Sequence, residues 1–495
     1  MNRRPVHLPH CLPTPIYSRR DFLRRTSSGF GALALSALLG SPMPQALATG
    51  NPSTRPNPLQ PKNPDFPARA RSVIFLYMEG AVSQVDSFDY KPLLEKYHGE
   101  DPRQAIGKLE KTQFDNVGKV FKSPWKFAQR GQSGLWVSDL FPHVAQQADK
   151  LCVIRSMTSS FPEHTSANYF LHSGLGLQGR PSMGSWVTYG LGSFNENLPG
   201  YVVLNGGQIP SGGLDNFGSG FLPATFQGSL LQAQGTPLEN VIPSEKISGL
   251  QEAKRRLVTK LNRESLAETV SSDPLESAIA NYELAARMQV TIPELMDLSG
   301  ETEATKKLYG LDADYEHTRT YARECILARR LVERGVRFIE LTIPSVSGVD
   351  RWDAHSNLLK NHGDNARAVD QPIAALLHDL GQRGLLDHTL VLWAGEFGRT
   401  PFAQGSDGRD HNEFAFSLWM AGAGVKPGFA YGETDEWGYR TVKDTLDIHD
   451  LHATILHLLG LDHTKLTYRF SGRDIRLTDV SGRVIRDLVL SPATS

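Results

Sequence analysis

Short apolar runs alternate along most of the chain with stretches in which apolar residues recur at helical spacing. The apolar runs have the length of buried β-strands, and they cover residues 71–78, 151–155, 336–342, 390–394 and 415–421. The stretches typical of helices cover residues 165–174, 321–334, 369–380 and 449–460. This alternation predicts an α/β fold in which a mainly parallel sheet is built through right-handed helical crossovers.

Two segments depart from the alternation. Residues 206–228 are rich in glycine and are predicted to form an extended loop. Residues 244–308 are charged and helical in character, which predicts an inserted helical segment of the domain. Such an insertion either packs as scaffold or covers the sheet edge as a lid, and the scaffold interpretation is the plainer one.

The first 48 residues have the order of parts found in a targeting signal. Residues 18–23 read Ser-Arg-Arg-Asp-Phe-Leu, an apolar stretch covers residues 29–40, and Ala-Leu-Ala at residues 46–48 resembles a cleavage site. We therefore predict a twin-arginine signal peptide over residues 1–48, with a disordered basic leader as the alternative. A Pro-rich linker at residues 49–68 and one domain at residues 69–495 would follow. The signal implies the twin-arginine export machinery as a partner and a periplasmic or secreted location.

The charge balance narrows the range of partners. Removing residues 1–48 takes six Arg and one Asp from the 52 basic and 53 acidic residues, which leaves a net charge of about −6. A nucleic acid is not an expected partner, because binding phosphates requires a concentrated positive surface. Cys152 and Cys325 lie in apolar surroundings and are expected to be buried thiols. No later apolar stretch of the chain is long enough to form a transmembrane segment.

Acidic residues and histidines follow several of the predicted strands. In a parallel sheet these strand ends meet at one edge, where ligands bind. Imidazoles and carboxylates are ligands of zinc, manganese and similar ions, and two such ions set close together assist phosphoryl-type transfer. Each residue taken singly is also explained by a structural role, as are the histidines of the helix at 449–460. The candidates are Glu79, His164, Asp353, His355, Glu396 and His411.

Longer motifs make the chain similar to a known family. It resembles the exported bacterial domain-of-unknown-function family 1501, which belongs with the sulfatase and alkaline phosphatase superfamily. The resemblance rests on VIFLYMEGAVSQVDSFDYKP, FGSGFLPATFQG, ANYELAARMQ, ARRLVERGVRF, WDAH, DHTLVLWAGEFGRTP, GRDHN and DLHATILHLLGLD. It implies an α/β three-layer sandwich and a hydrolase of sulfate or phosphate esters. The substrate would be a small-molecule or polysaccharide ester, and the cofactor a divalent metal such as zinc, calcium or manganese.

The resemblance also implies roles for individual residues. Glu79 stands where the superfamily usually has a metal-binding Asp, and Asp353 with His355 matches a later metal pair. Glu396-Phe397-Gly398 stands for an Asp-His-Gly motif, so Phe397 occupies a ligand position, and His411 matches the last metal-binding His. His164, with Thr165 beside it, occupies the position of the covalent nucleophile.

Because His164 replaces the usual nucleophile, three interpretations follow. Metal-activated water can be the attacking group, with Glu79, Asp353, His355, Glu396 and His411 as metal ligands. His164 can act as nucleophile or as general acid and base. Alternatively, the chain is a non-catalytic envelope or glycan-binding protein on a hydrolase scaffold that has lost its activity.

Overall fold

The computed structural model describes residues 57–114, 116–238, 249–268 and 273–491. The predicted signal peptide and most of the predicted linker lie outside these residues. Among the described residues, no helix has both the length and the apolar character needed to cross a bilayer.

An eight-stranded sheet forms the centre of the domain, with the strand order β12-β4-β11-β8-β1-β7-β5-β6. Every neighbouring pair is parallel except the two pairs that involve β11. The predicted α/β fold with a mainly parallel sheet is therefore confirmed. The strands are β1 (Ser72–Tyr77), β4 (Leu151–Met157), β5 (Tyr201–Asn205), β6 (Ser229–Gln232), β7 (Phe338–Leu341), β8 (Thr389–Ala394), β11 (Phe416–Ala421) and β12 (Phe429–Tyr431).

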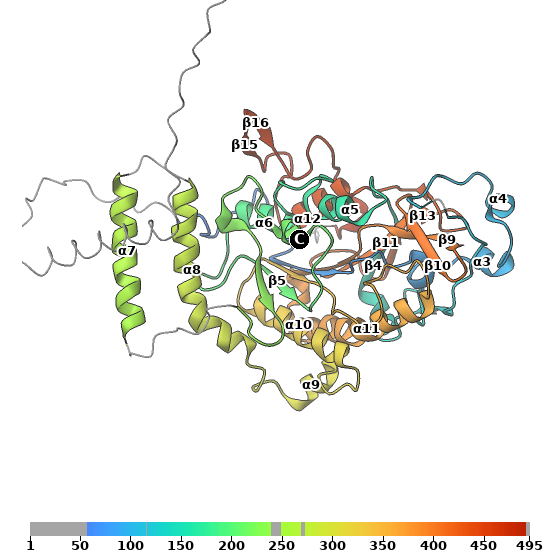
Figure 1. Cartoon of the computed structure of the whole chain (residues 1–495), viewed down its shortest axis with the longest axis horizontal. Helices are drawn as coiled ribbons and strands as arrows, with labels where there is room; N and C mark the ends of the chain where they lie inside the picture. The colour runs from blue at the N-terminus through green and yellow to red at the C-terminus, as the bar shows by residue number, and fades with distance from the viewer. Residues whose placement is uncertain (1–56, 115, 239–248, 269–272, 492–495) are drawn as a thin grey trace, which may run out of the picture. The chain divides into compact units, whose positions relative to one another are not determined.

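Helices cover both faces of this sheet and make it the middle of three layers (Figure 1). One layer contains α5 (His164–Ser173), α6 (Met183–Leu191) and α12 (Ile448–Leu458). The other contains α10 (Glu316–Glu333) and α11 (Leu358–Gln382). Because both faces are covered, the central strands β1 and β8 are buried along their whole length and read as continuous apolar runs.

The strands β5 and β6 were not predicted, although they border the predicted loop at residues 206–228. The run Tyr201–Asn205 is short and lies between glycines, and Ser229–Gln232 has only two apolar residues. Strands this short give no periodic signal, and their conformation is decided by pairing, of β5 with β7 and of β6 with β5.

The segment expected to be helical contains α7 (Leu250–Glu268), α8 (Asp273–Met296) and α9 (Glu303–Tyr309). In α8, the side chains of Leu284, Met288, Ile292 and Leu295 are buried at helical spacing. Arg323 and Arg330 of α10 donate hydrogen bonds to the last carbonyls of α8, those of Met296 and Leu295, at 2.7 Å each. These contacts make α8 part of the scaffold, whereas none of the described side chains of α7 is buried.

A buried polar network attaches α5 to the sheet. Nε2 of His172 lies 2.7 Å from Glu340 of β7, and the hydroxyl of Tyr201 donates to the same carboxylate at 2.6 Å. His172 also packs edge-on against Tyr77 of β1. Because buried charges require partners, this network fixes α5 against one face of the sheet.

Candidate metal centre

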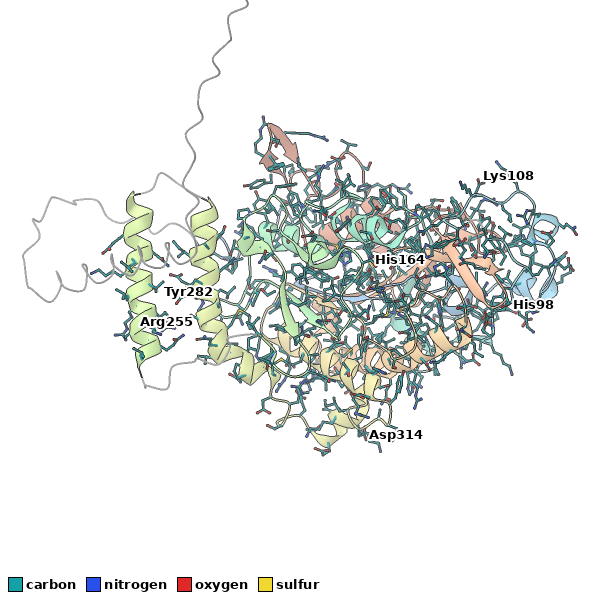
Figure 2. The ribbon with its side chains drawn as sticks, viewed as in Figure 1. His98, Lys108, His164, Arg255, Tyr282 and Asp314 are labelled. Atoms are coloured by element: carbon teal, nitrogen blue, oxygen red, sulfur yellow. The ribbon has the colours of Figure 1, made fainter. Side chains whose placement is uncertain are left out.

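The predicted site residues come from five places along the chain and meet at the carboxyl edge of the sheet. Glu79 and Glu396 follow β1 and β8, and Asp353 lies in the loop between β7 and α11. His411 belongs to β10 (Gly408–Asn412), which pairs with β9 (Gly398–Gln404). His164, labelled in Figure 2, is the first residue of α5.

The carboxylate of Asp353 is the centre of this cluster. Its Oδ1 lies 2.9 Å from Nε2 of His355 and 3.3 Å from Nε2 of His411. Its Oδ2 lies 3.2 Å from Nε2 of His164. The ligand atoms of His164, Asp353 and His411 lie within 4.8 Å of one another, so these residues are close enough to share one ion.

The other ring nitrogen of each histidine is held by a neighbouring oxygen. Nδ1 of His411 lies 2.6 Å from the carbonyl oxygen of Pro162, and Nδ1 of His164 lies 2.5 Å from Oε1 of Glu396. Nδ1 of His355 contacts Oε1 of Gln404. Since these oxygens accept hydrogen bonds, each Nδ1 carries the proton. The rings then turn Nε2 towards Asp353, which is how histidine is usually oriented in metal sites.

This arrangement leaves polar atoms that the protein does not satisfy. Nε2 of His164 and Oε2 of Glu396 are buried and have no hydrogen-bond partner among the described residues. An unprotonated Nε2 of His411 also faces Oδ1 of Asp353, so that lone pair faces lone pair. Unsatisfied buried polar atoms are costly, and a divalent cation between them would remove that cost.

Burial and neighbouring charges shift the pKa values of these groups in opposite directions. Burial lowers the pKa of His411 to about 3, so its imidazole is neutral. Burial would also lower the pKa of His164, but the carboxylates of Asp353 and Glu396 raise it to about 9. Burial opposes ionisation of Asp353 as well, yet Arg399 and the adjacent histidines hold its pKa well below the usual range.

Arg399 is a site residue that the sequence analysis missed. Its guanidinium is fully buried and donates from Nη2 to Oδ1 of Asp353 at 2.5 Å. Its Nε donates to the carbonyl of Ala81 at 3.1 Å, which ties β9 to the end of β1. The available signal was a charged residue directly after Glu396-Phe397-Gly398, inside a stretch predicted to lie at the site.

Glu396 lies behind His164 and supports it. Its Oε1 accepts the Nδ1 proton of His164 and the backbone N–H of Gly80, the latter at 2.9 Å. Glu79 has different partners, since its Oε2 lies 2.9 Å from Nε of Arg351 and its Oε1 accepts the N–H of Ser211 at 2.5 Å. Burial raises the pKa of Glu79 to about 7, and the neighbouring Glu396 adds to this rise.

Thr165 is exposed beside His164 at the start of α5. The side chain of Glu163 caps this helix by accepting the N–H groups of Thr165 at 2.9 Å and Ser166 at 2.5 Å. A carboxylate of the protein therefore occupies the place where a helix N-terminus would otherwise bind an anion.

Two phenylalanines form the apolar wall of the cluster. Phe397 is buried, and its ring centroid lies 4.9 Å from that of His164 and 4.6 Å from that of His411. Phe114 is about half exposed and lies edge-on to His355 at 4.8 Å. The position where the resemblance implied a ligand thus contains an aromatic ring that packs on the histidines.

The histidines of α12 lie outside this cluster. Nε2 of His452 lies 2.8 Å from the carbonyl of Leu171, and Nε2 of His449 lies 2.9 Å from that of Gly174. His457 packs against Phe66. Their contacts agree with the structural role expected of them from the sequence.

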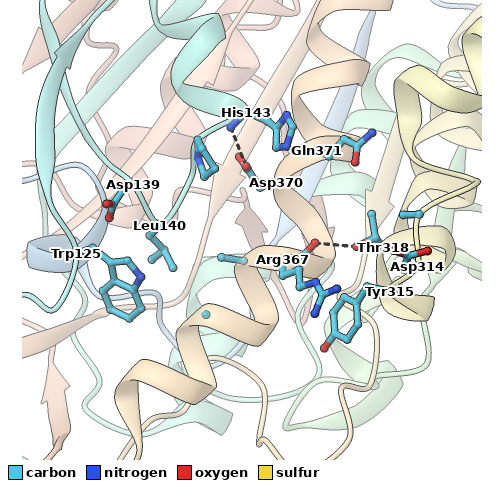
Figure 3. A pocket seen from close by; sticks show the side chains of 14 residues that line it. Trp125, Asp139, Leu140, His143, Asp314, Tyr315, Thr318, Arg367, Asp370 and Gln371 are labelled. Carbon is cyan, nitrogen blue, oxygen red and sulfur yellow. Dashed lines mark hydrogen bonds between the residues drawn. The ribbon is translucent and has the colours of Figure 1, made fainter.

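A cavity of about 370 Å³ lies beside α11 and is lined by Trp125, Tyr315 and Arg367, among others (Figure 3). In the lining of this cavity, the buried carboxylate of Asp370 accepts the N–H groups of His143 and Val144, at 2.8 Å each. This cavity shares no lining residue with the Asp353 cluster, and Asp370 serves to hold the segment that leads into β4.

Comparison with solved structures gives remote similarities to hydrolases. PsFucS1 sulfatase from Pseudoalteromonas sp. matches with 12% identity and a TM-score of 0.33, over 79% of this chain and 68% of that one. Phosphonate monoester hydrolase SpPMH from Silicibacter pomeroyi matches with 10% identity and a TM-score of 0.37, over 86% and 78%. Alkaline phosphatase from the Antarctic bacterium TAB5 matches with 10% identity and a TM-score of 0.33, over 79% and 98%.

Among curated proteins the sequence has no match. A family model described as "Protein of unknown function (DUF1501)" matches residues 70–489, which is most of the chain. The resemblance drawn from the sequence motifs is thereby confirmed, and the chain belongs to the DUF1501 family.

Proposed function

We propose that this protein is an exported, divalent-metal-dependent hydrolase of sulfate or phosphate esters. The observation that carries the proposal is the convergence of Nε2 atoms on Asp353, with each Nδ1 held by a neighbouring oxygen. Nε2 of His164 has no hydrogen-bond partner among the described residues, although it lies 3.2 Å from Oδ2 of Asp353. A metal ion explains this orientation, because metal-binding histidines commonly donate their second N–H to a carboxylate or a carbonyl.

The donor set fits some metals better than others. His164, Asp353 and His411 would hold the ion, with His355 beside them as a further donor. Imidazole and carboxylate together suit zinc or manganese, whereas calcium prefers oxygen ligands. We therefore expect zinc or manganese.

Each neighbouring residue has a role in holding these donors. Glu396 and the carbonyl of Pro162 fix the rings of His164 and His411, and Arg399 orients Asp353. When bound, the ion would polarise the ester and favour negative charge on its oxygens. Phe397 limits the access of water to the inner side of the histidines. His164 would then be a ligand, and its use as nucleophile or general acid and base is the alternative.

Export and substrate complete the proposal. Residues 1–48 would direct the folded chain through the twin-arginine machinery to the periplasm or the exterior. The substrate would be a small-molecule or polysaccharide ester, with no nucleic acid as partner.

The first test measures metal binding by the purified protein without residues 1–48. Zinc is titrated into chelator-treated protein, and bound metal is counted after dialysis. We expect stoichiometric zinc in the wild type and a loss of affinity of about 100-fold or more in His411→Ala and Asp353→Asn. Failure of the wild type to bind zinc or manganese would remove the proposal.

The second candidate function is a non-catalytic glycan-binding protein. It is favoured by Glu163, whose carboxylate accepts hydrogen bonds from the N–H groups that could otherwise bind a substrate anion. Sulfate and phosphate esters of sugars and of nitrophenol, offered to the zinc-loaded protein, separate the candidates. Turnover that His411→Ala abolishes supports the hydrolase, whereas glycan binding with no turnover supports the second candidate. His164→Ala with unchanged turnover would exclude a catalytic role for His164.

A further inference from the structure

Two buried glutamates stand side by side at the centre of the sheet edge. Tyr77 of β1 is the register partner of Ala394 of β8, and the N–H of Met78 continues the ladder by donating to the carbonyl of Ala394 at 2.9 Å. Glu79 and Glu396 each lie two residues further on, so the register places them opposite each other. The N–H of Gly80 donates to Glu396 at 2.9 Å, which confirms their proximity. Two adjacent buried carboxylates require compensating positive charge.

Arg351 supplies a positive charge at this place. Its Nε lies 2.9 Å from Oε2 of Glu79, and its Nη1 lies 3.0 Å from Oδ1 of Asp350. The Arg351 side chain is 24% exposed, whereas the side chains of Glu79 and Glu396 are almost completely buried. With Ser211 on Oε1, both oxygens of Glu79 are bound by protein groups.

The backbone holds Arg351 in this position. Its φ of 38° lies in the left-handed region, which is uncommon for a residue with a side chain and persists only where neighbours enforce it. The next residue, Trp352, donates its N–H to the carbonyl of Glu79 at 3.0 Å. The side chain of Asn365 in α11 donates to the carbonyl of Arg351. The placement of the guanidinium is therefore built into the loop that also carries Asp353.

We propose that Arg351 is a permanent second cation of the site, so that the chain binds one metal ion and Glu79 serves as the counter-ion of Arg351. The inference rests on the proposed function, since it assumes that His164, Asp353 and His411 bind a metal. Oε2 of Glu396, which has no partner among the described residues, and Oε2 of Glu79 would be the oxygens freed for a second ion if the guanidinium were removed.

The experiment counts zinc ions per chain by calorimetric titration and by elemental analysis after dialysis. The wild type should bind one ion, and Arg351→Met should bind a second, because it leaves two adjacent carboxylates without a cation. Arg351→Lys keeps the charge and should bind one. Arg334→Met is the matched control, since Arg334 is also 24% exposed and pairs with a glutamate, Glu294, far from the site in sequence.

A separate variant keeps the inference testable if Arg351→Met fails to fold. Glu79→Gln should leave zinc stoichiometry and affinity within about twofold of wild type, because Glu79 is not a ligand in this scheme. A loss of affinity above tenfold would overturn the inference, as would two ions in the wild type or one in folded Arg351→Met. Binding of neither zinc nor manganese by the wild type would instead overturn the proposed function itself, and the inference with it.

Discussion

At the scale of single residues, the site depends on which nitrogen of each histidine carries the proton. His164, His355 and His411 all direct Nδ1 to an oxygen of the protein and Nε2 to Asp353. The supporting oxygens come from a glutamate, a glutamine and a backbone carbonyl, so no single sequence motif encodes them. The consequence is a set of Nε2 atoms that face one carboxylate.

A histidine outside the site gives a prediction for stability against pH. Burial lowers the pKa of His452 to about 3, below the usual value of 6.5. Between about pH 3 and pH 6.5, His452 is therefore protonated in the unfolded chain but neutral in the folded chain. The free energy of unfolding falls as the pH decreases below about 6.5. From pH 7.5 to 5.0 we expect the wild type to lose about 2 kcal/mol more unfolding free energy than His452→Gln.

Urea unfolding of both proteins at the two pH values measures this difference. Gln can still donate to the carbonyl of Leu171, which His452 contacts at 2.8 Å, but it does not titrate. His388→Gln is the control, because His388 is exposed, and it should keep the slope of the wild type. Equal losses in wild type and His452→Gln would contradict the prediction.

At the scale of elements, the end of β1 is joined to the loop that carries Asp353. Gly80 has a φ of 99°, and a Cβ atom placed there would lie 2.5 Å from the backbone nitrogen of Trp352 and 2.7 Å from that of Asp353. Contacts this close with backbone atoms cannot be relieved by a side-chain rotation. Glycine is required because strand and loop approach at this point.

The substitution Gly80→Ala should therefore displace the loop and weaken metal binding. Gly107 is a matched control, since its φ is 90° but nothing lies within 4 Å of its added Cβ. Each substitution should lower the unfolding free energy by about 1 kcal/mol, because alanine is strained at a positive φ. Gly80→Ala should lower it by about 1–3 kcal/mol more, because its Cβ meets backbone atoms. Urea unfolding and zinc titration of the two variants check this. Similar losses in both would show that the close approach has no energetic effect.

Helix α8 of the inserted segment has one side in the core and another side exposed to solvent. Ile292 of α8 is fully buried, whereas Val290, two residues earlier, is 77% exposed. We expect Ile292→Ala to lower the unfolding free energy by about 2–5 kcal/mol and Val290→Ala to change it by less than about 0.5 kcal/mol. Chemical denaturation of the two variants is the measurement. Equal small effects would mean that α8 does not contribute to the core.

At the scale of the whole molecule, the candidate centre joins parts of the chain that are far apart in sequence. His164, Asp353 and His411 come from α5, the loop before α11 and β10. An ion that binds all of them binds the folded chain but not the unfolded one, so it should stabilise the whole domain.

Thermal unfolding should detect this coupling. At a free zinc concentration about 100 times the dissociation constant, the stabilisation is about 2.7 kcal/mol, or a rise of about 3 °C in Tm for a domain of this size. A chelator should reverse the rise, and Asp353→Asn should not show it. An increase in Tm that persists in Asp353→Asn would place the bound zinc elsewhere.

The sequence by itself determined the fold class and the residues that meet at the sheet edge. The strands Ser72–Tyr77 and Thr389–Ala394 are buried on both faces. They are therefore continuous apolar runs, which the sequence alone identifies as strands. The parallel order then brings the residues after these strands to one edge, which is why Glu79, Asp353, Glu396 and His411 could be named together.

Only the tertiary structure decided what each of these residues does there. Glu396 accepts a hydrogen bond from His164, and Glu79 pairs with Arg351. Asp353 contacts the histidines and Arg399. These roles depend on distances of about 3 Å between atoms that lie far apart along the chain. Hydrophobic periodicity reports burial, but it carries no information about which polar atoms face each other once the strands have assembled.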